Sequence, residues 1–106
     1  MESSRAVAAL LVLAALPASE PAGAQSQALA VAQIAATCAG CHGTQGREAD
    51  GASLPSLAGM PKASALASLQ AFKSGARPAT IMHQLAKGYT DAQLEQIADY
   101  FAAQLK

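Results

Sequence analysis

The stretch Cys38-Ala39-Gly40-Cys41-His42 holds both cysteines of this 106-residue chain and one of its two histidines. Two thiols three residues apart, followed directly by an imidazole, constrain the fold more than any other feature, because each use of the pair needs a different architecture. Four uses have to be weighed: a disulfide, a redox dithiol, half of a zinc site, and the covalent attachment of a larger group.

The first three uses fit the rest of the chain poorly. A disulfide between Cys38 and Cys41 would close a loop too small to stabilise a domain, because the entropic gain grows with loop length. A dithiol of the thioredoxin kind needs a strand-to-helix junction, and the sequence lacks the alternating runs of β-branched and aromatic residues that form strands. A structural zinc site needs four ligands, and no second cysteine pair exists.

The fourth use is favoured because the pattern C-x-x-C-H specifies covalent haem attachment. Thioethers from Cys38 and Cys41 would join the two vinyl groups, and His42 would bind the iron from the proximal side. Composition agrees with this interpretation: 52% of residues are hydrophobic but only 4% are aromatic. An apolar content that is mostly alanine buries little area per residue, so a large flat cofactor would enlarge the core. We therefore expect one haem c.

A second axial ligand must come from elsewhere in the chain, and the candidates are Met60, Met82 and His83. A thioether favours ferrous iron and raises the reduction potential, whereas a second histidine lowers it. Met60 lies only 18 residues after His42, while Met82 lies 40 residues after it with a whole predicted helix between them. We therefore predict His42 and Met82 as the iron ligands and expect His83 at the surface.

The N-terminal segment has the pattern of an export signal. Arg5 precedes an apolar run of eleven residues, Ala6 to Leu16, and a small-residue site follows at Ala22-Gly23-Ala24. The run is shorter than the roughly 20 residues that a membrane-spanning helix needs. The sequence thus predicts a signal peptide at residues 1–24, one domain at residues 25–106, periplasmic or secreted localisation, and no stable membrane span after cleavage.

The remaining chain predicts an all-α domain of three to four helices with long loops. We expect a first helix from about Ser26 to the cysteines and a loop over residues 43–60, which contain four glycines. A second helix starts near Pro61 and ends at Gly75. Short helical turns over residues 80–87 come next, closed by a glycine.

Thr90 and Gln93 predict a capping box at the start of the last helix. Two apolar faces are expected from the helical period. The face on the first helix comprises Leu29, Ala32, Ile34 and Ala35. The face on the last helix comprises Leu94, Ile97, Ala98, Phe101 and Leu105.

These motifs, in this order, resemble the class I cytochromes c. The resemblance rests on the CAGCH stretch, on Met82, and on the segments 54–59 and 94–101. Within that family, residues 72–82 and 86–91 are similar to the haem subunit of flavocytochrome c sulfide dehydrogenase and related single-haem cytochromes. The resemblance implies a fold built around one covalently attached haem, with the Pro55 carbonyl accepting a hydrogen bond from His42. It also implies that the first and last helices cross near the haem edge, at Tyr100.

The resemblance further implies an electron carrier without catalysis of its own. We expect a periplasmic monohaem carrier that exchanges one electron at a time with redox proteins. The alternative is a haem subunit that accepts electrons from a flavoprotein sulfide dehydrogenase partner. A third reading, an open iron that binds gas or peroxide, applies if Met82 does not ligate. Zero net charge and 13% charged residues argue against nucleic acid as a partner.

Overall fold

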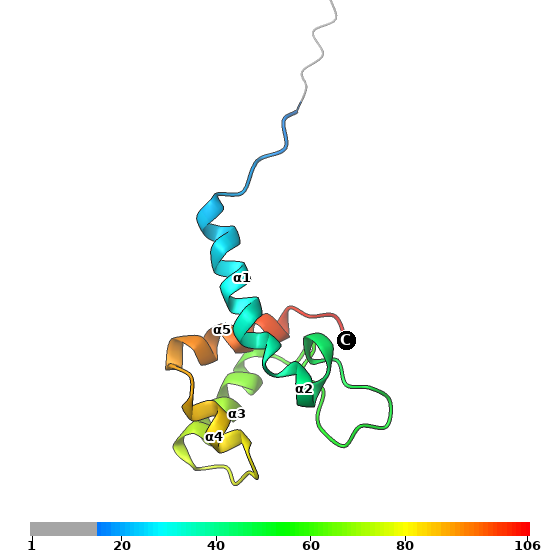
Figure 1. The fold of residues 1–106 in the computed structure, drawn as a ribbon, viewed down its shortest axis with the longest axis vertical. Helices are drawn as coiled ribbons and strands as arrows, with labels where there is room; N and C mark the ends of the chain where they lie inside the picture. The colour runs from blue at the N-terminus through cyan, green and yellow to red at the C-terminus, as the bar shows by residue number, and fades with distance from the viewer. Residues whose placement is uncertain (1–14) are drawn as a thin grey trace, which may run out of the picture.

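A computed structural model describes residues 15–106 of the chain. Arg5 and most of the predicted apolar run therefore lie outside the described residues. Within 15–106 the chain is helical without strands, as the sequence predicted (Figure 1). The elements are α1 (Ala22–Ala36), α2 (Ala39–His42), the 3₁₀ turn η1 (Thr44–Gly46), α3 (Lys62–Ser74), α4 (Met82–Lys87) and α5 (Asp91–Ala102).

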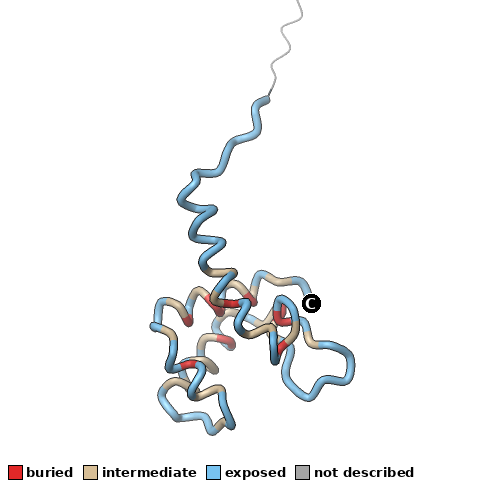
Figure 2. Tube along the Cα trace, viewed as in Figure 1, coloured by how far each residue is buried: buried red, intermediate tan, exposed pale blue. Residues whose placement is uncertain are grey.

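The first helix, α1, starts four residues earlier than predicted and projects from the globule (Figure 1). Pro21 stands at its N-cap with extended geometry, and the alanine-rich sequence that follows is strongly helix-forming. Residues 21–30 are all exposed, and the pale tube in Figure 2 shows this half of the helix free of the other elements. The predicted burial of Leu29 is wrong, because its side chain is 67% exposed.

The helices α3 and α4 begin and end close to the predicted positions. α3 ends at Gly75, whose φ of 80° is the left-handed conformation that glycine adopts without strain. α4 is followed by Gly88 at its C-cap. Figure 1 shows α4 beside α3 on one side of the globule and α2 on the other.

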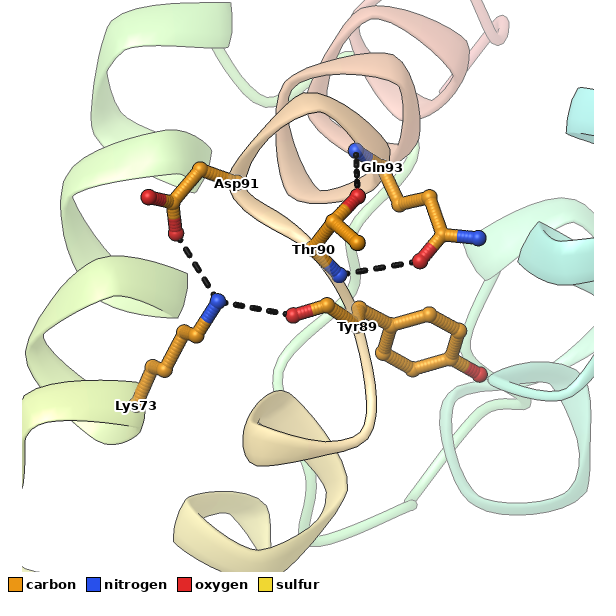
Figure 3. A network of polar contacts seen from close by, with 5 residues as sticks. All are labelled: Lys73, Tyr89, Thr90, Asp91 and Gln93. Atoms are coloured by element: carbon orange, nitrogen blue, oxygen red, sulfur yellow. Dashed lines mark hydrogen bonds and ion pairs between the residues drawn. The ribbon is translucent and has the colours of Figure 1, made fainter.

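The last helix, α5, has the predicted capping box at its start. The Thr90 hydroxyl accepts a hydrogen bond from the Gln93 backbone N–H at 3.1 Å, and the Gln93 side chain accepts one from the Thr90 backbone at 2.9 Å (Figure 3). Lys62 at the start of α3 forms ion pairs with Glu95 and Asp99 of α5. These contacts raise the pKa of Lys62, chiefly through Asp99, and join the two helices at the surface.

The core is small and rich in alanine. Of the eight buried hydrophobic side chains in residues 15–106, five are alanine. The other three, Leu94, Ile97 and Phe101, form a cluster with Ala35 of α1, so α1 and α5 meet there. The predicted stripe on α5 is confirmed except at Leu105, which lies beyond the end of the helix and is 80% exposed.

Candidate functional site

The two cysteines and the neighbouring histidine lie on a single helical turn. Cys38 caps α2, and its carbonyl oxygen accepts hydrogen bonds from the backbone N–H groups of Cys41 at 3.3 Å and His42 at 2.9 Å. Positions i, i+3 and i+4 share one face of a helix. The spacing C-x-x-C-H therefore directs both sulfur atoms and the imidazole to the same side of α2.

Gly43 ends this turn in a conformation that favours glycine. Its φ is 85°, and a Cβ added there would lie 1.8 Å from the carbonyl oxygen of Arg47. Any larger residue would have to shift the backbone directly after His42. The chain thus needs a glycine here to leave α2 and enter η1.

The His42 ring is buried and oriented by a backbone carbonyl. Its Nδ1 lies 2.8 Å from the oxygen of Pro55, and the side chain is 8% exposed. A carbonyl oxygen can only accept a hydrogen bond, so Nδ1 carries the proton and donates it. The lone pair of the neutral ring then resides on Nε2, which is the atom free to bind a metal.

The loop that carries Pro55 is closed by one carbonyl group. The oxygen of Gly46 accepts hydrogen bonds from the backbone N–H groups of Leu57 at 2.8 Å and Ala58 at 3.1 Å, and from the Ser56 hydroxyl at 2.9 Å. Gly46 is buried against the Phe101 ring, where an added Cβ would lie 2.7 Å from the nearest ring atom. These contacts fix the loop against α5 and set the position of the Pro55 carbonyl.

The face of α2 that carries Cys38, Cys41 and His42 lines a cavity of about 490 Å³. This volume falls within the range of about 300–1,000 Å³ that is typical of cofactor and ligand pockets. The other walls come from the 54–60 loop, α3, the 77–81 segment before α4, α4 and α5. Their apolar side chains include Leu54, Leu57, Leu69, Phe72, Ile81, Leu85, Ile97 and Phe101.

Both candidate thioethers line the same cavity, whereas the second histidine does not. Met82 at the start of α4 and Met60 at the end of the loop are among the lining residues. Met60 also lines a second, more open cavity beside Arg47 and Lys106. His83 is half-buried rather than at the surface as predicted, and its Nδ1 lies buried without a hydrogen-bond partner in residues 15–106.

The two cysteines differ in their surroundings. Burial raises the pKa of the Cys38 thiol, and the nearby Cys41 raises it further. Cys41 is exposed. The half-buried position of Cys38 disfavours a thiolate and suits an uncharged sulfur.

Tyr89 is a cavity residue that was not predicted from the sequence. Its hydroxyl lies 2.7 Å from Thr37 Oγ1, which itself donates to the Ile34 carbonyl, so Tyr89 is the donor of this bond. Lys73 Nζ donates to the Tyr89 carbonyl and pairs with Asp91, each at 2.8 Å (Figure 3). This network joins the end of α1 to the turn before α5.

A sequence signal for Tyr89 does exist. The residue before an N-cap often packs on the fourth residue of the helix, which forms a hydrophobic staple. Tyr89 precedes the Thr90 cap and packs against the core cluster that contains Leu94. The capping box could therefore have placed this aromatic ring in the interior.

Residues 15–106 contain neither a cluster of metal-binding side chains nor a helix that could span a membrane. No group of three or more His, Cys, Asp or Glu side chains converges there as a metal-ion cage. No helix in that range combines the length and apolarity required to cross a bilayer.

Comparison with known proteins places these features in a family context. Residues 28–104 match the family model for cytochrome c. The chain is 40% identical over 68 residues to the cytochrome subunit of sulfide dehydrogenase from Chlorobaculum tepidum, an alignment that covers 64% of this chain and 60% of the relative.

Two further relatives are more distant. The thiosulfate dehydrogenase electron acceptor of Thiomonas intermedia is 37% identical over 64% of this chain and 31% of its own length. Cytochrome c-552 of Acidithiobacillus ferridurans is 36% identical over 62% of this chain and 28% of its own length. The chain thus spans less than two thirds of each relative.

Proposed function

Because the chain belongs to the cytochrome c family, whose members bind haem c and carry electrons, we propose that it is a periplasmic monohaem carrier with His42 and Met82 as axial ligands. In this proposal Cys38 and Cys41 hold the haem covalently. Bound haem supplies a one-electron couple between ferric and ferrous iron. The work of the protein is to hold both ligands, exclude water and leave an edge accessible to redox partners.

The observation that carries the proposal is the apolar cavity beside α2. The three residues of the C-x-x-C-H pattern share one wall of a space of about 490 Å³, and Met82 lies in another wall. His42 is already oriented by Pro55, with Nε2 as the atom that can bind iron. Buried residues of the core, Ala65, Ala86, Ile97, Ala98 and Phe101, also line the cavity. An apolar ligand here would extend the small core.

Met82 is preferred to Met60 as the second ligand for a reason of placement. Met60 shares the loop with Pro55, which contacts His42 directly, whereas Met82 begins α4 on the other side of the globule (Figure 1). His42 and Met82 would hold the iron between them, and the Met82 thioether would favour its ferrous state. A residue on a separate element can bind the iron without straining the His42–Pro55 contact.

A second candidate function is supported by a relative named as the cytochrome subunit of sulfide dehydrogenase. In this alternative the chain is a haem subunit that accepts electrons from a flavoprotein partner. Purification from the native source distinguishes the two: flavin absorbance that co-elutes with haem absorbance supports the stable subunit, and haem that elutes alone supports the free carrier.

The proposal includes export, with residues 1–24 as the signal peptide and residues 25–106 as the domain. Cleavage after Ala24 would remove the first three residues of α1, which are exposed. Attachment of haem to the cysteine pair is expected to follow export.

The experiment that tests the function is expression in a host that matures exported cytochromes, followed by haem staining after denaturing electrophoresis. We expect the native chain to retain haem through denaturation, because thioether bonds survive it. The double variant Cys38→Ser, Cys41→Ser should lose this staining completely. Ala39→Ser, in the same turn, is the matched control and should stain as the native chain does. Equal staining of the double variant and the control would contradict covalent attachment.

A further inference from the structure

Arg77 carries the only permanent charge among the described residues that line the cavity beside α2. Its guanidinium carbon lies 4.7 Å from the centroid of the Phe72 ring, and its Nη1 donates to the Ser68 hydroxyl at 3.2 Å. Its backbone N–H donates to the Ala71 carbonyl at 3.1 Å. These contacts with α3 hold an exposed cationic group at the rim of an otherwise apolar space.

Most of the hydrogen-bonding capacity of Arg77 faces no partner within the described part of the chain. A guanidinium group has five N–H donors in a planar fork, and the Ser68 hydroxyl takes one of them. The ion pairs between residues 15 and 106 involve Lys62 and Lys73 instead. The fork geometry matches a carboxylate, which can accept two parallel hydrogen bonds.

An apolar cavity with one arginine at its rim suits a ligand that is apolar over most of its surface and carries a carboxylate at its edge. Haem c has this form, with two propionate groups on one edge of the macrocycle. We propose that Arg77 binds a haem propionate and thereby positions the haem and raises its reduction potential. This inference rests on the proposed function, because it requires haem in the cavity.

Lys87 is a second cationic residue that could bind a haem propionate, and the structure separates it from Arg77. Arg77 and Lys87 lie five residues before and five residues after Met82, so sequence distance does not distinguish them. Lys87 is exposed at the end of α4 and is not among the residues that line the cavity. Arg77 lines it directly.

The sign of the electrostatic effect follows from the charges. A guanidinium cation beside the haem disfavours the more positive ferric state and therefore raises the potential. It also favours the ionised propionate, so it lowers the propionate pKa. The other titratable side chains that line the cavity are Cys38, Cys41, His42 and Tyr89. The proposed function uses the first three in attachment and ligation, and the Tyr89 hydroxyl donates to Thr37.

The test is a spectroelectrochemical titration of the haem-loaded protein between pH 5 and pH 9, with four proteins: native, Arg77→Gln, Arg77→Lys and Lys87→Gln. Above the propionate pKa, Arg77→Gln should lower the ratio of ferrous to ferric haem at a fixed applied potential several-fold. The step in potential that accompanies propionate titration should move to higher pH. Arg77→Lys should lie between the native protein and Arg77→Gln, because it keeps the charge but loses the fork. Lys87→Gln should match the native protein.

Two results would overturn the inference. One is a native potential and pH profile in Arg77→Gln, and the other is an equal change in Arg77→Gln and Lys87→Gln. The absorption spectrum of each protein separates failure of this inference from failure of the proposed function. Absence of haem absorbance from the native protein would contradict the function itself. If Arg77→Gln yields no loaded protein, the comparison of Arg77→Lys with Lys87→Gln still decides between the outcomes.

Discussion

At the scale of single residues, the site divides into positions that a motif specifies and positions that only the fold brings together. The spacing of Cys38, Cys41 and His42 fixes their common face, because one helical turn requires it. The sequence therefore predicted their joint placement. The role of Gly46 was not predicted, because it depends on a loop closure that joins segments far apart in the chain.

Both methionines of the site, Met82 and Met60, line the cavity, so substitution of each tests which one binds the iron. Met82→Ala should leave haem attached but open one axial position, because its thioether is the proposed ligand. The reduction potential should then fall, and the reduced protein should bind roughly one carbon monoxide per haem, as an open ferrous site does. Met60→Ala is the matched control and should remain hexacoordinate, with little change in its spectrum on adding carbon monoxide. Reversal of the two behaviours would assign the ligand to Met60.

At the scale of helices, the ends marked by special residues were predictable and the exposed surfaces were not. Gly75 and the Thr90–Gln93 pair act locally, so their signals do not depend on the rest of the fold. Leu29 was expected to be buried because it follows the helical period. That period identifies an apolar face but cannot show how far the partner helix extends, and α5 does not cover the first turns of α1.

The capping box at the start of α5 should contribute measurably to the stability of the domain. Thr90→Ala removes the hydroxyl that accepts the Gln93 N–H, and such a loss costs about 1 kcal/mol. For a domain of this size, that corresponds to a decrease of roughly 4–8 °C in the unfolding temperature. Thr80→Ala, an exposed threonine outside the helices, is the control and should unfold close to the native temperature. Calorimetry on haem-loaded protein measures both, and equal midpoints for the two variants would argue against the cap as a source of stability.

At the scale of the whole molecule, the composition indicated a weak core, and the structure confirms it. Alanine supplies most of the buried hydrophobic positions among residues 15–106, and the cavity lies against several of them. The sequence could suggest that a cofactor was needed. It could not show which side chains would form the walls, because these come from segments far apart in the chain whose packing is a property of the fold.

The variant Leu94→Ala tests how much the α1–α5 contact contributes to the free energy of unfolding, separately from the cavity. Leu94 is fully buried in the core cluster and does not line the cavity, so Leu94→Ala leaves the proposed haem contacts intact. We expect the free energy of unfolding to fall by about 2–5 kcal/mol, as for other buried leucines. Leu105→Ala should change it by less than about 0.5 kcal/mol, because that side chain is exposed. Denaturant titration followed by helical circular dichroism compares the two, and a small effect at Leu94 would show that α1 is held mainly by other contacts.

The exposed first half of α1 has a consequence for the motion of the molecule. An isolated helical segment of this length is marginal in water, and helix–coil relaxation takes about 0.1–1 μs. Residues 22–30 should therefore fray and re-form on that timescale while Ala35, buried against α5, stays in place until the globule itself unfolds. The N-terminal end of α1 should therefore unfold locally and often, whereas its C-terminal end should open only with the globule. The cysteines follow that C-terminal end.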